Sequence, residues 1–147
     1  MPHTKAGSWF TGLVLEVFRF HGRLLAAGDR LTKPLNLSSA RWQVLGAIEQ
    51  CPLSVAQIAR NMGLTRQTVQ KLADELNRGQ FVQYAPNPDH KRAKLVCQTE
   101  KSRHVMKVLE QRQLRWANEV AEGVKDEEME AALRLIHKLR VQVELND

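Results

Sequence analysis

The chain has 147 residues and carries a formal net charge of +6 at pH 7. This length fits one domain with a genuine core, or a small domain extended by helices for assembly, and it is short for two separate domains. The two cysteines, Cys51 and Cys97, exclude a disulfide framework and a cysteine-rich zinc site, and they fit a reducing cytoplasm.

The N-terminal segment has the apolar periodicity of one long helix, from Ser8 to about Ala27. Its apolar run is interrupted by Glu16 and followed by Arg19 and Arg23, so it indicates neither a transmembrane span nor a signal peptide. We therefore expect a cytoplasmic protein without a membrane partner.

A second helix is predicted from Ser38 or Ser39 to Gln50, because Pro52 prevents its continuation. The next stretch, from Val55 to Leu72, has the pattern of a helix-turn-helix. Its apolar residues are spaced to face one shared core, and they are Ile58, Met62, Leu64, Val69 and Leu72.

Small residues and caps at fixed places support this motif. Ala59 allows the two helices to approach closely, and Gly63 can adopt the positive φ that the turn needs. Ser54 with Gln57 three residues later is a capping-box pattern, and Thr65 can cap the second helix. The alternative is an ordinary helical hairpin, which the agreement of spacing, turn glycine and polar outer face disfavours.

The outer face of the second motif helix is polar, with Arg66, Gln67, Thr68, Gln70, Lys71 and Asp74. Such side chains suit recognition of base edges and phosphates. Residues 60–107 carry ten basic and four acidic side chains, whereas residues 108–147 carry six and nine. A basic block on the motif indicates a DNA-facing surface, although charge alone fits a solvated basic face equally well.

A small hairpin is predicted after Gly79, which ends the second motif helix. Phe81 to Tyr84 alternates as a strand should, Ala93 to Gln98 supplies its partner, and the turn contains Pro86, Asn87, Pro88 and Asp89.

Two helices complete the chain, one from about Thr99 to Val124 and one from about Asp126 to Leu145. Each has an apolar stripe at helical spacing: Val105, Val108, Leu109, Trp116 and Val120 in the first, and Met129, Leu133, Ile136, Leu139 and Val143 in the second. Because the motif has its own core, we infer that these helices and the N-terminal one pack on a second copy in a two-fold dimer. The alternative is packing within one chain.

This order of elements, and the residues from about Leu37 to Ser102, resemble the MarR (multiple antibiotic resistance regulator) family of winged-helix transcription factors. The first similar piece runs from Leu37 to Leu45, and the second from Leu53 to Leu76. The third is the turn Gly79-Gln80-Phe81-Val82 with the wing that follows, Asn87-Pro88-Asp89-His90-Lys91-Arg92-Ala93-Lys94.

The chain departs from the family pattern in two places. Family wings usually have an Asp two residues before the arginine that matches Arg92, whereas this chain has His90 there and Asp89 one position earlier. A family Leu-Thr followed by Gly is here Gln98-Thr99 and Ser102. The bracing of the wing arginine and the junction into the next helix are therefore open.

The resemblance implies a mainly α (α+β) fold with a winged helix-turn-helix and long terminal dimerisation helices. The expected domains are an N-terminal dimerisation helix in 1–36, the DNA-binding domain in 37–99, and C-terminal dimerisation helices in 100–147. The implied function is sequence-specific binding of double-stranded DNA by a homodimer, on a pseudo-palindrome with half-sites about 10 base pairs apart. Repression is the default, since a dimer on promoter DNA most simply excludes polymerase.

By the same resemblance, the DNA-contacting residues would come from the second motif helix and the wing. Lys91 and Arg92 would reach an adjacent minor groove. The residues that would enter the major groove or hold its phosphates are Thr65, Arg66, Gln67, Thr68, Gln70 and Lys71.

Many members of the family resemble switches operated by a small molecule held between the dimer helices and the winged domain. Phe18, His21, Leu24 and Trp42 could line such a crevice, since an apolar wall with one titratable group suits an aromatic or amphipathic acid. The alternative is that all four are core residues. The sequence also leaves open whether Cys51 or Cys97 responds to redox state.

The sequence contains no nucleophile with a base, no paired carboxylates in a supporting context and no glycine-rich phosphate loop. The five histidines lack metal-binding spacing. We therefore expect no enzyme, no catalytic residue, no cofactor and no metal. The competing class is a winged-helix interaction module that binds an acidic protein partner, or DNA without sequence preference.

Overall fold

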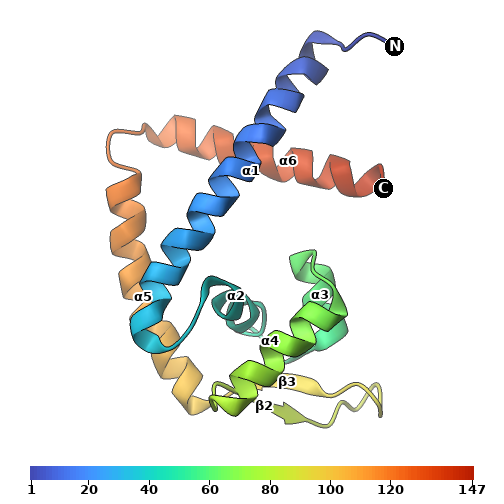
Figure 1. Ribbon diagram of the computed structural model, residues 1–147, viewed down its shortest axis with the longest axis vertical. Coiled ribbons are helices and arrows are strands. Elements are labelled where there is room, and N and C mark those ends of the chain that lie inside the picture. Colours follow the sequence, from blue (N-terminus) through green and yellow to red (C-terminus); the bar gives the residue numbers. More distant parts are fainter. The chain divides into compact units, whose positions relative to one another are not determined.

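The computed structural model describes residues 1–147, which form two compact units, Met1–Arg112 and Gln113–Asp147. The first unit begins with α1 (Lys5–Thr32), the 3₁₀ turn η1 (Lys33–Leu35) and α2 (Ser39–Ala47). A short strand β1 (Leu53–Ser54) leads into α3 (Val55–Met62) and α4 (Arg66–Arg78), and the strands β2 (Val82–Ala85) and β3 (Leu95–Gln98) follow. Helix α5 (Glu100–Val120) starts in this unit and ends in the second, which also contains α6 (Asp126–Leu145). Figure 1 gives the order of these elements.

The predicted mainly helical fold class is confirmed, and so are the local signals of the helix-turn-helix. Ser54 and Gln57 form both halves of the capping box, with Ser54 Oγ accepting from Gln57 N at 3.2 Å and Gln57 Oε1 accepting from Ser54 N at 2.9 Å. Gly63 has φ +65° at the end of α3, as the turn requires. Gly79 is the C-cap of α4.

Several predicted boundaries are wrong. Helix α1 begins earlier than Ser8, because Thr4 Oγ1 caps it by accepting from Gly7 N, and it continues beyond Ala27 to Thr32. Helix α2 ends at Ala47 rather than Gln50, with Glu49 N turning back to Gly46 O. Helix α5 stops at Val120 rather than Val124.

The predicted hairpin is part of a three-stranded antiparallel sheet with the order β1-β3-β2. Val96 of the central strand β3 pairs with Leu53 of β1 on one side and with Tyr84 of β2 on the other. Strand β2 runs to Ala85, one residue further than predicted, and starts at Val82 rather than Phe81. Because β1 lies directly before α3, the sheet holds the start of the helix-turn-helix against the wing.

One core fills the space between the helices and the sheet of the first unit. Its fully buried members include Val44, Leu45, Ile58, Val69, Leu76, Val96 and Leu109. Two sequence expectations fail here: Leu64, predicted inside, is 40% exposed, and Leu109 of α5 is fully buried in this core rather than free for a partner. The start of α5 is therefore part of the winged-helix unit.

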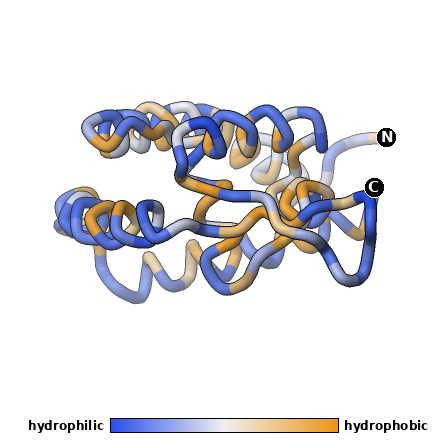
Figure 2. Tube along the Cα trace, turned by 90° about the horizontal axis from the view of Figure 1, so that it is seen from below, coloured by the Kyte–Doolittle hydropathy of each residue, from blue (hydrophilic) through white to orange (hydrophobic).

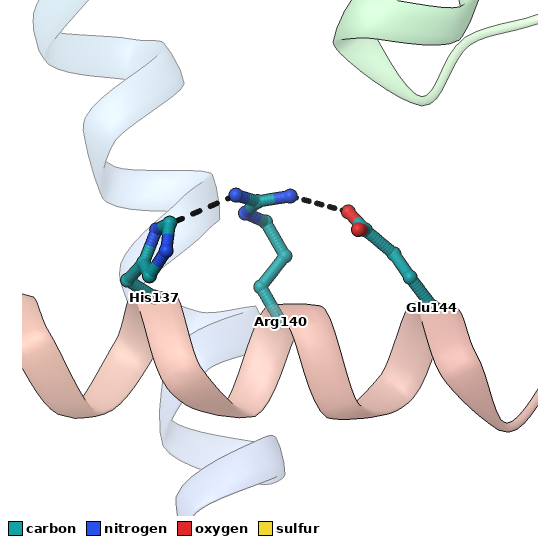
Figure 3. Close-up of polar contacts among 3 residues, drawn as sticks. All are labelled: His137, Arg140 and Glu144. Atoms are coloured by element: carbon teal, nitrogen blue, oxygen red, sulfur yellow. Dashed lines mark hydrogen bonds and ion pairs between the residues drawn. The ribbon is translucent and has the colours of Figure 1, made fainter.

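Helix α6 of the second unit has three carboxylates in its first turn, Asp126, Glu127 and Glu128. Negative charges at this end stabilise the helix, because the helix dipole is positive at the N-terminus. Its predicted apolar stripe is largely exposed, including Leu133 at 71%. An exposed polar row also runs along it: Arg140 donates to Glu144 and lies 3.4 Å from His137 Nδ1 (Figure 3). Hydrophobic and hydrophilic residues alternate along the helices (Figure 2), and none of the helices is long and apolar enough to cross a membrane.

Candidate nucleic-acid interface

Helix α4 starts at a well-formed cap. Thr65 Oγ1 accepts from Thr68 N at 3.1 Å and donates to Thr68 Oγ1 at 2.9 Å. Both threonines were predicted to contact DNA, and both are exposed at the N-terminus of the helix. The unpaired N–H groups of such an end attract anions, so this cap suits a phosphate.

The helix buries one face and exposes the other. Val69, Ala73 and Leu76 are fully buried in the core. The predicted base- and phosphate-contacting side chains are all exposed, namely Arg66, Gln67, Thr68, Gln70 and Lys71. The amphipathic pattern therefore leaves a continuous hydrogen-bonding face free.

A cavity of about 630 Å³ lies between α4 and the wing, which run beside each other (Figure 1). Its lining includes Arg66, Gln67 and Gln70 from the helix and Arg92 and Lys94 from the wing. The structure thus brings four of the predicted residues around one hollow. Thr65, Thr68, Lys71 and Lys91 lie outside this lining.

Two basic residues that the sequence reasoning missed also belong to this surface. Lys94 lines the first cavity, and Arg60 of α3 lines a second cavity of about 550 Å³ together with Arg66 and the wing residue His90. Arg60 could have been found from its position in the last turn of α3, where a basic side chain precedes the motif turn.

Lys91 and Arg92 are exposed in the loop that joins β2 to β3. The loop is folded by its own bonds, since Asn87 Oδ1 accepts from Asp89 N at 3.0 Å and Asn87 O accepts from His90 N at 3.3 Å. The ion pairs of the structure involve Arg19, Arg134 and Arg140, so neither Asp89 nor another carboxylate braces Arg92. At this departure from the family wing, the guanidinium of Arg92 therefore has no ion-pair partner.

Asp74 was grouped with the outward-facing residues, and the structure gives it a different environment. Its Oδ1 accepts from Tyr84 Oη at 2.5 Å and from Gln70 Nε2 at 3.0 Å, and Gln70 Nε2 also lies 3.1 Å from Tyr84 Oη. We call Gln70, Asp74 and Tyr84 the polar triad. It ties the recognition helix α4 to the wing strand β2, and sequence alone could not join residues ten positions apart in different elements.

The triad fixes two protonation states. The hydrogen bond from Tyr84, and then that from Gln70, hold the pKa of Asp74 below its ordinary value, with a smaller effect of Arg78. Burial, and then the bond to Asp74, raise the pKa of Tyr84 well above its ordinary value. At neutral pH Asp74 is therefore ionised and Tyr84 keeps its proton.

The predicted effector residues lie on two helices, α1 and α2. Phe18 is 70% exposed and Leu24 39% exposed on α1, and His21 is exposed there as well. Trp42 of α2 is half-buried and packs against the core. Of the four, Trp42 packs against the core of a single chain, and the other three are exposed in it. Cys51 is exposed, and Cys97 is half-buried in β3.

Comparisons with known proteins agree with this arrangement. A model of the MarR family matches residues 35–93, which include the helix-turn-helix and most of the wing. An uncharacterised protein of Mycobacterium tuberculosis is 31% identical over 129 residues, covering 88% of this chain and 90% of its own length.

Two further proteins are similar to the chain. The transcriptional activatory protein BadR of Rhodopseudomonas palustris is 29% identical over 107 residues, covering 70% of this chain and 61% of that protein. The solved structure of a MarR protein from Peptoclostridium difficile superimposes with a TM-score of 0.84 at 20% identity, covering 91% of this chain and 88% of that one. The chain therefore shares with this structure a winged-helix fold with long N- and C-terminal helices.

Proposed function

We propose that this chain, which belongs to the MarR family of winged-helix transcription regulators, binds a specific pseudo-palindromic operator in double-stranded DNA as a homodimer. The observation that carries the proposal is the shared hollow between α4 and the wing, which Arg66 and Arg92 line from opposite sides. A helix flanked by a basic wing can place one element in the major groove while the other follows the adjacent phosphates or minor groove.

The exposed residues of α4 and the wing divide into those suited to base edges and those suited to phosphates. Arg66, Gln67 and Gln70 have the planar, hydrogen-bonding ends that read base edges. Lys71, Lys91 and the Thr65 cap suit phosphates, which position the protein without reading sequence. Arg92, free of any ion pair, suits a narrow minor groove, where the negative potential is strongest.

The dimer is proposed to form through the terminal helices, in residues 1–36 and 100–147, around a DNA-binding domain in 37–99. Large apolar side chains that are exposed in a single chain support this. They include Trp9 at 75%, Phe18 at 70% and Phe20 at 56% on α1, and Leu133 at 71% on α6. Apolar side chains of this size, exposed in this number, indicate an interface.

Repression by occupying promoter DNA is proposed as the mode of regulation, and an aromatic or amphipathic acid as the effector that releases the operator. Phe18, His21 and Leu24 are free on α1 to meet such a ligand in the dimer. BadR is named an activatory protein, so the position of the operator relative to the promoter decides the sign of regulation.

The test is selection of bound duplexes from random or genomic fragments, followed by anisotropy titration of the selected duplex and a scrambled control at two salt concentrations. A pseudo-palindromic winner bound about 10³-fold or more tightly than the control supports the proposal. Equal and steeply salt-dependent binding of both duplexes would contradict it and favour a basic interaction module that binds an acidic partner.

A further inference from the structure

The second cavity, of about 550 Å³, lies between α3, the start of α4 and the wing loop. Its basic lining residues come from all three parts: Arg60 of α3, Arg66 of α4 and His90 of the wing loop. Asp89 is the acidic residue of the lining, and it makes no ion pair with either arginine. Two arginines against one carboxylate give the cavity a net positive charge even when His90 is neutral.

The capping box of α3 adds hydrogen-bond donors to the same lining. Gln57 Oε1 accepts from Ser54 N at 2.9 Å, so the amide oxygen of Gln57 is used and its NH₂ group is unpaired. Ser54 Oγ accepts from Gln57 N at 3.2 Å, and its own hydroxyl hydrogen is unpaired as well. Both residues line the second cavity. A ligand that fits this lining must bring acceptor oxygens and negative charge.

The position of the cavity favours a phosphate of the DNA backbone as that ligand. Arg66 lines both cavities, so the second cavity adjoins the exposed face of α4. His90 directly precedes Lys91 and Arg92, the wing residues that are proposed to contact DNA. A DNA strand that passes between a recognition helix and a neighbouring wing brings its phosphates over the space between them.

We infer that the second cavity is a phosphate site of the DNA backbone, in which Arg60 binds from α3 and His90 binds from the wing, most strongly as the imidazolium. The imidazolium has two donors and a full charge, whereas neutral imidazole has one donor. The inference rests on the proposed function, because it requires duplex DNA on α4 and the wing.

This site predicts that DNA binding takes up protons. Histidine is the side chain whose charge ordinarily changes between about pH 5 and 8. The charged groups that share the cavity with His90 are Arg60, Arg66 and Asp89, and guanidinium and carboxylate groups keep their charges throughout that range. A bound phosphate favours the charged form of His90, so affinity for DNA falls as pH rises.

The experiment is anisotropy titration of the selected operator and of a scrambled duplex at about pH 6 and about pH 8, at equal ionic strength. His104→Gln is the matched control, because His104 is an exposed histidine of α5 that lines neither cavity. The variants to be compared with it are His90→Gln, Arg60→Ala and Asp89→Asn.

His90→Gln preserves the local hydrogen bonds of the wing loop. The imidazole of His90 makes no hydrogen bond, and its backbone N–H and C=O bond to Asn87 O and Ala93 N, both at 3.3 Å. These backbone bonds do not depend on the side chain. Urea unfolding of every variant establishes that it folds before affinities are compared.

We expect the wild-type chain to bind both duplexes more tightly at the lower pH, by about fivefold for each protomer, the upper range for one exposed ion pair. His90→Gln removes most of this difference, and His104→Gln keeps it. Arg60→Ala weakens binding at both pH values and reduces the salt slope by about 1 for each protomer. Asp89→Asn strengthens binding, because it removes a carboxylate that repels the phosphate.

A second measurement locates the phosphate. Operators in which one phosphate at a time is replaced by a neutral methylphosphonate are titrated with the wild-type chain, Arg60→Ala and His90→Gln. At the phosphate bound in the second cavity, the replacement weakens the wild-type chain more than either variant, because the variants have already lost that contact. At phosphates bound elsewhere the losses are equal.

The outcomes separate the inference from the function beneath it. If the wild-type chain binds no duplex, the proposed function fails and the inference fails with it. If both duplexes bind equally, sequence specificity is lost, whereas a pH effect on both that depends on His90 still supports the phosphate site. If an operator is selected but His90→Gln keeps the full pH difference, or no methylphosphonate distinguishes Arg60→Ala from the wild-type chain, only the inference is overturned.

Discussion

Gly28 and Ser39 are in direct contact where α1 meets α2: a Cβ built on Gly28 would lie 2.0 Å from Ser39 Oγ. Ser39 is held in place on both sides, since its Oγ donates to Leu25 O at 2.8 Å and its backbone N–H donates to Asp29 Oδ1 at 2.8 Å. Both residues are buried. This contact joins the proposed dimerisation helix to the DNA-binding domain.

Gly28→Ala is expected to destabilise the protein by about 1–3 kcal/mol, because a methyl group in this buried contact forces side chains or backbone to shift. Helix propensity alone would favour alanine by up to about 1 kcal/mol, so the sign of the effect distinguishes the two causes. The measurement is urea unfolding at one fixed protomer concentration, since the stability of a dimer depends on concentration.

The control for this prediction is Gly46→Ala, because a Cβ at that position meets nothing within 4 Å and α2 is otherwise unchanged. It should be neutral or stabilising. Combining Gly28→Ala with Ser39→Ala leaves the Ser39 Cβ, at 3.2 Å, as the nearest side-chain atom, so the double variant should lose less than the sum of the single variants. Strict additivity would contradict the contact.

Tyr84 is the only tyrosine of the chain, so the rise of tyrosinate absorbance with pH reports the ionisation of this residue alone. Burial and the bond to Asp74 raise its pKa, so the folded protein should form tyrosinate only well above pH of about 10. Asp74→Asn removes the negative charge and should bring the titration down toward the ordinary value. If the tyrosinate titration of the folded protein had the same midpoint as that of the urea-unfolded chain, the hydrogen bonds of the polar triad would be excluded.

The same pair makes stability depend on pH in a definite direction. Because the pKa of Asp74 is lowered in the folded state, its contribution is present above its unfolded value of about 4 and is lost as pH falls through the folded value. Because the pKa of Tyr84 is raised, its contribution is present below about pH 10 and is lost as pH rises through the folded value. The stability difference between the wild-type chain and Asp74→Ala with Tyr84→Phe should therefore be flat between these limits and shrink beyond both.

Local signals made the helix-turn-helix predictable from sequence. The capping box at Ser54, the Thr65 cap and the positive φ of Gly63 each depend on residues within three or four positions, and each is confirmed. Both bounds of α6, Asp126 and Leu145, were also correct, since an acidic first turn marks where that helix begins.

Features that depend on distant residues were missed. Strand β1 has only two residues and is defined by its pairing with β3, more than forty positions away. Two residues are too few to show the alternation of apolar and polar side chains that predicts a strand. The polar triad likewise joins α4 to β2 through side chains, which is why Asp74 was grouped with free surface residues. Leu64 followed the apolar spacing but lies in the turn after Gly63, where helical periodicity no longer sets the direction of a side chain.

Arg66→Ala and Arg92→Ala are each expected to weaken binding of the selected operator by about 1–3 kcal/mol and to relax base preference, because each removes a bidentate or minor-groove contact. Lys71→Ala should instead weaken binding to all duplexes similarly and reduce the salt slope by about 1. Anisotropy titrations of operator and scrambled duplex at several salt concentrations measure both effects.

The matched control for these substitutions is Arg103→Ala, which removes one positive charge from an exposed site in α5 that lines neither cavity of the interface. It should reduce affinity only slightly and without change in sequence preference. Operator affinity equal to that of the wild-type chain in either Arg66→Ala or Arg92→Ala would remove that arginine from the interface.

Leu133→Glu is expected to convert the proposed dimer into monomer. Leu133 is 71% exposed in α6, and burying a leucine contributes about 1.5–3 kcal/mol, lost twice in a symmetric dimer. The dissociation constant should therefore rise about 100-fold or more, which size-exclusion chromatography with light scattering over a dilution series would detect.

Gln142→Glu adds the same charge to the same helix at a position that is already polar, so it should remain dimeric. A wild-type chain that is monomeric at micromolar concentration, or a dimer that Leu133→Glu leaves intact, would exclude α6 from the interface.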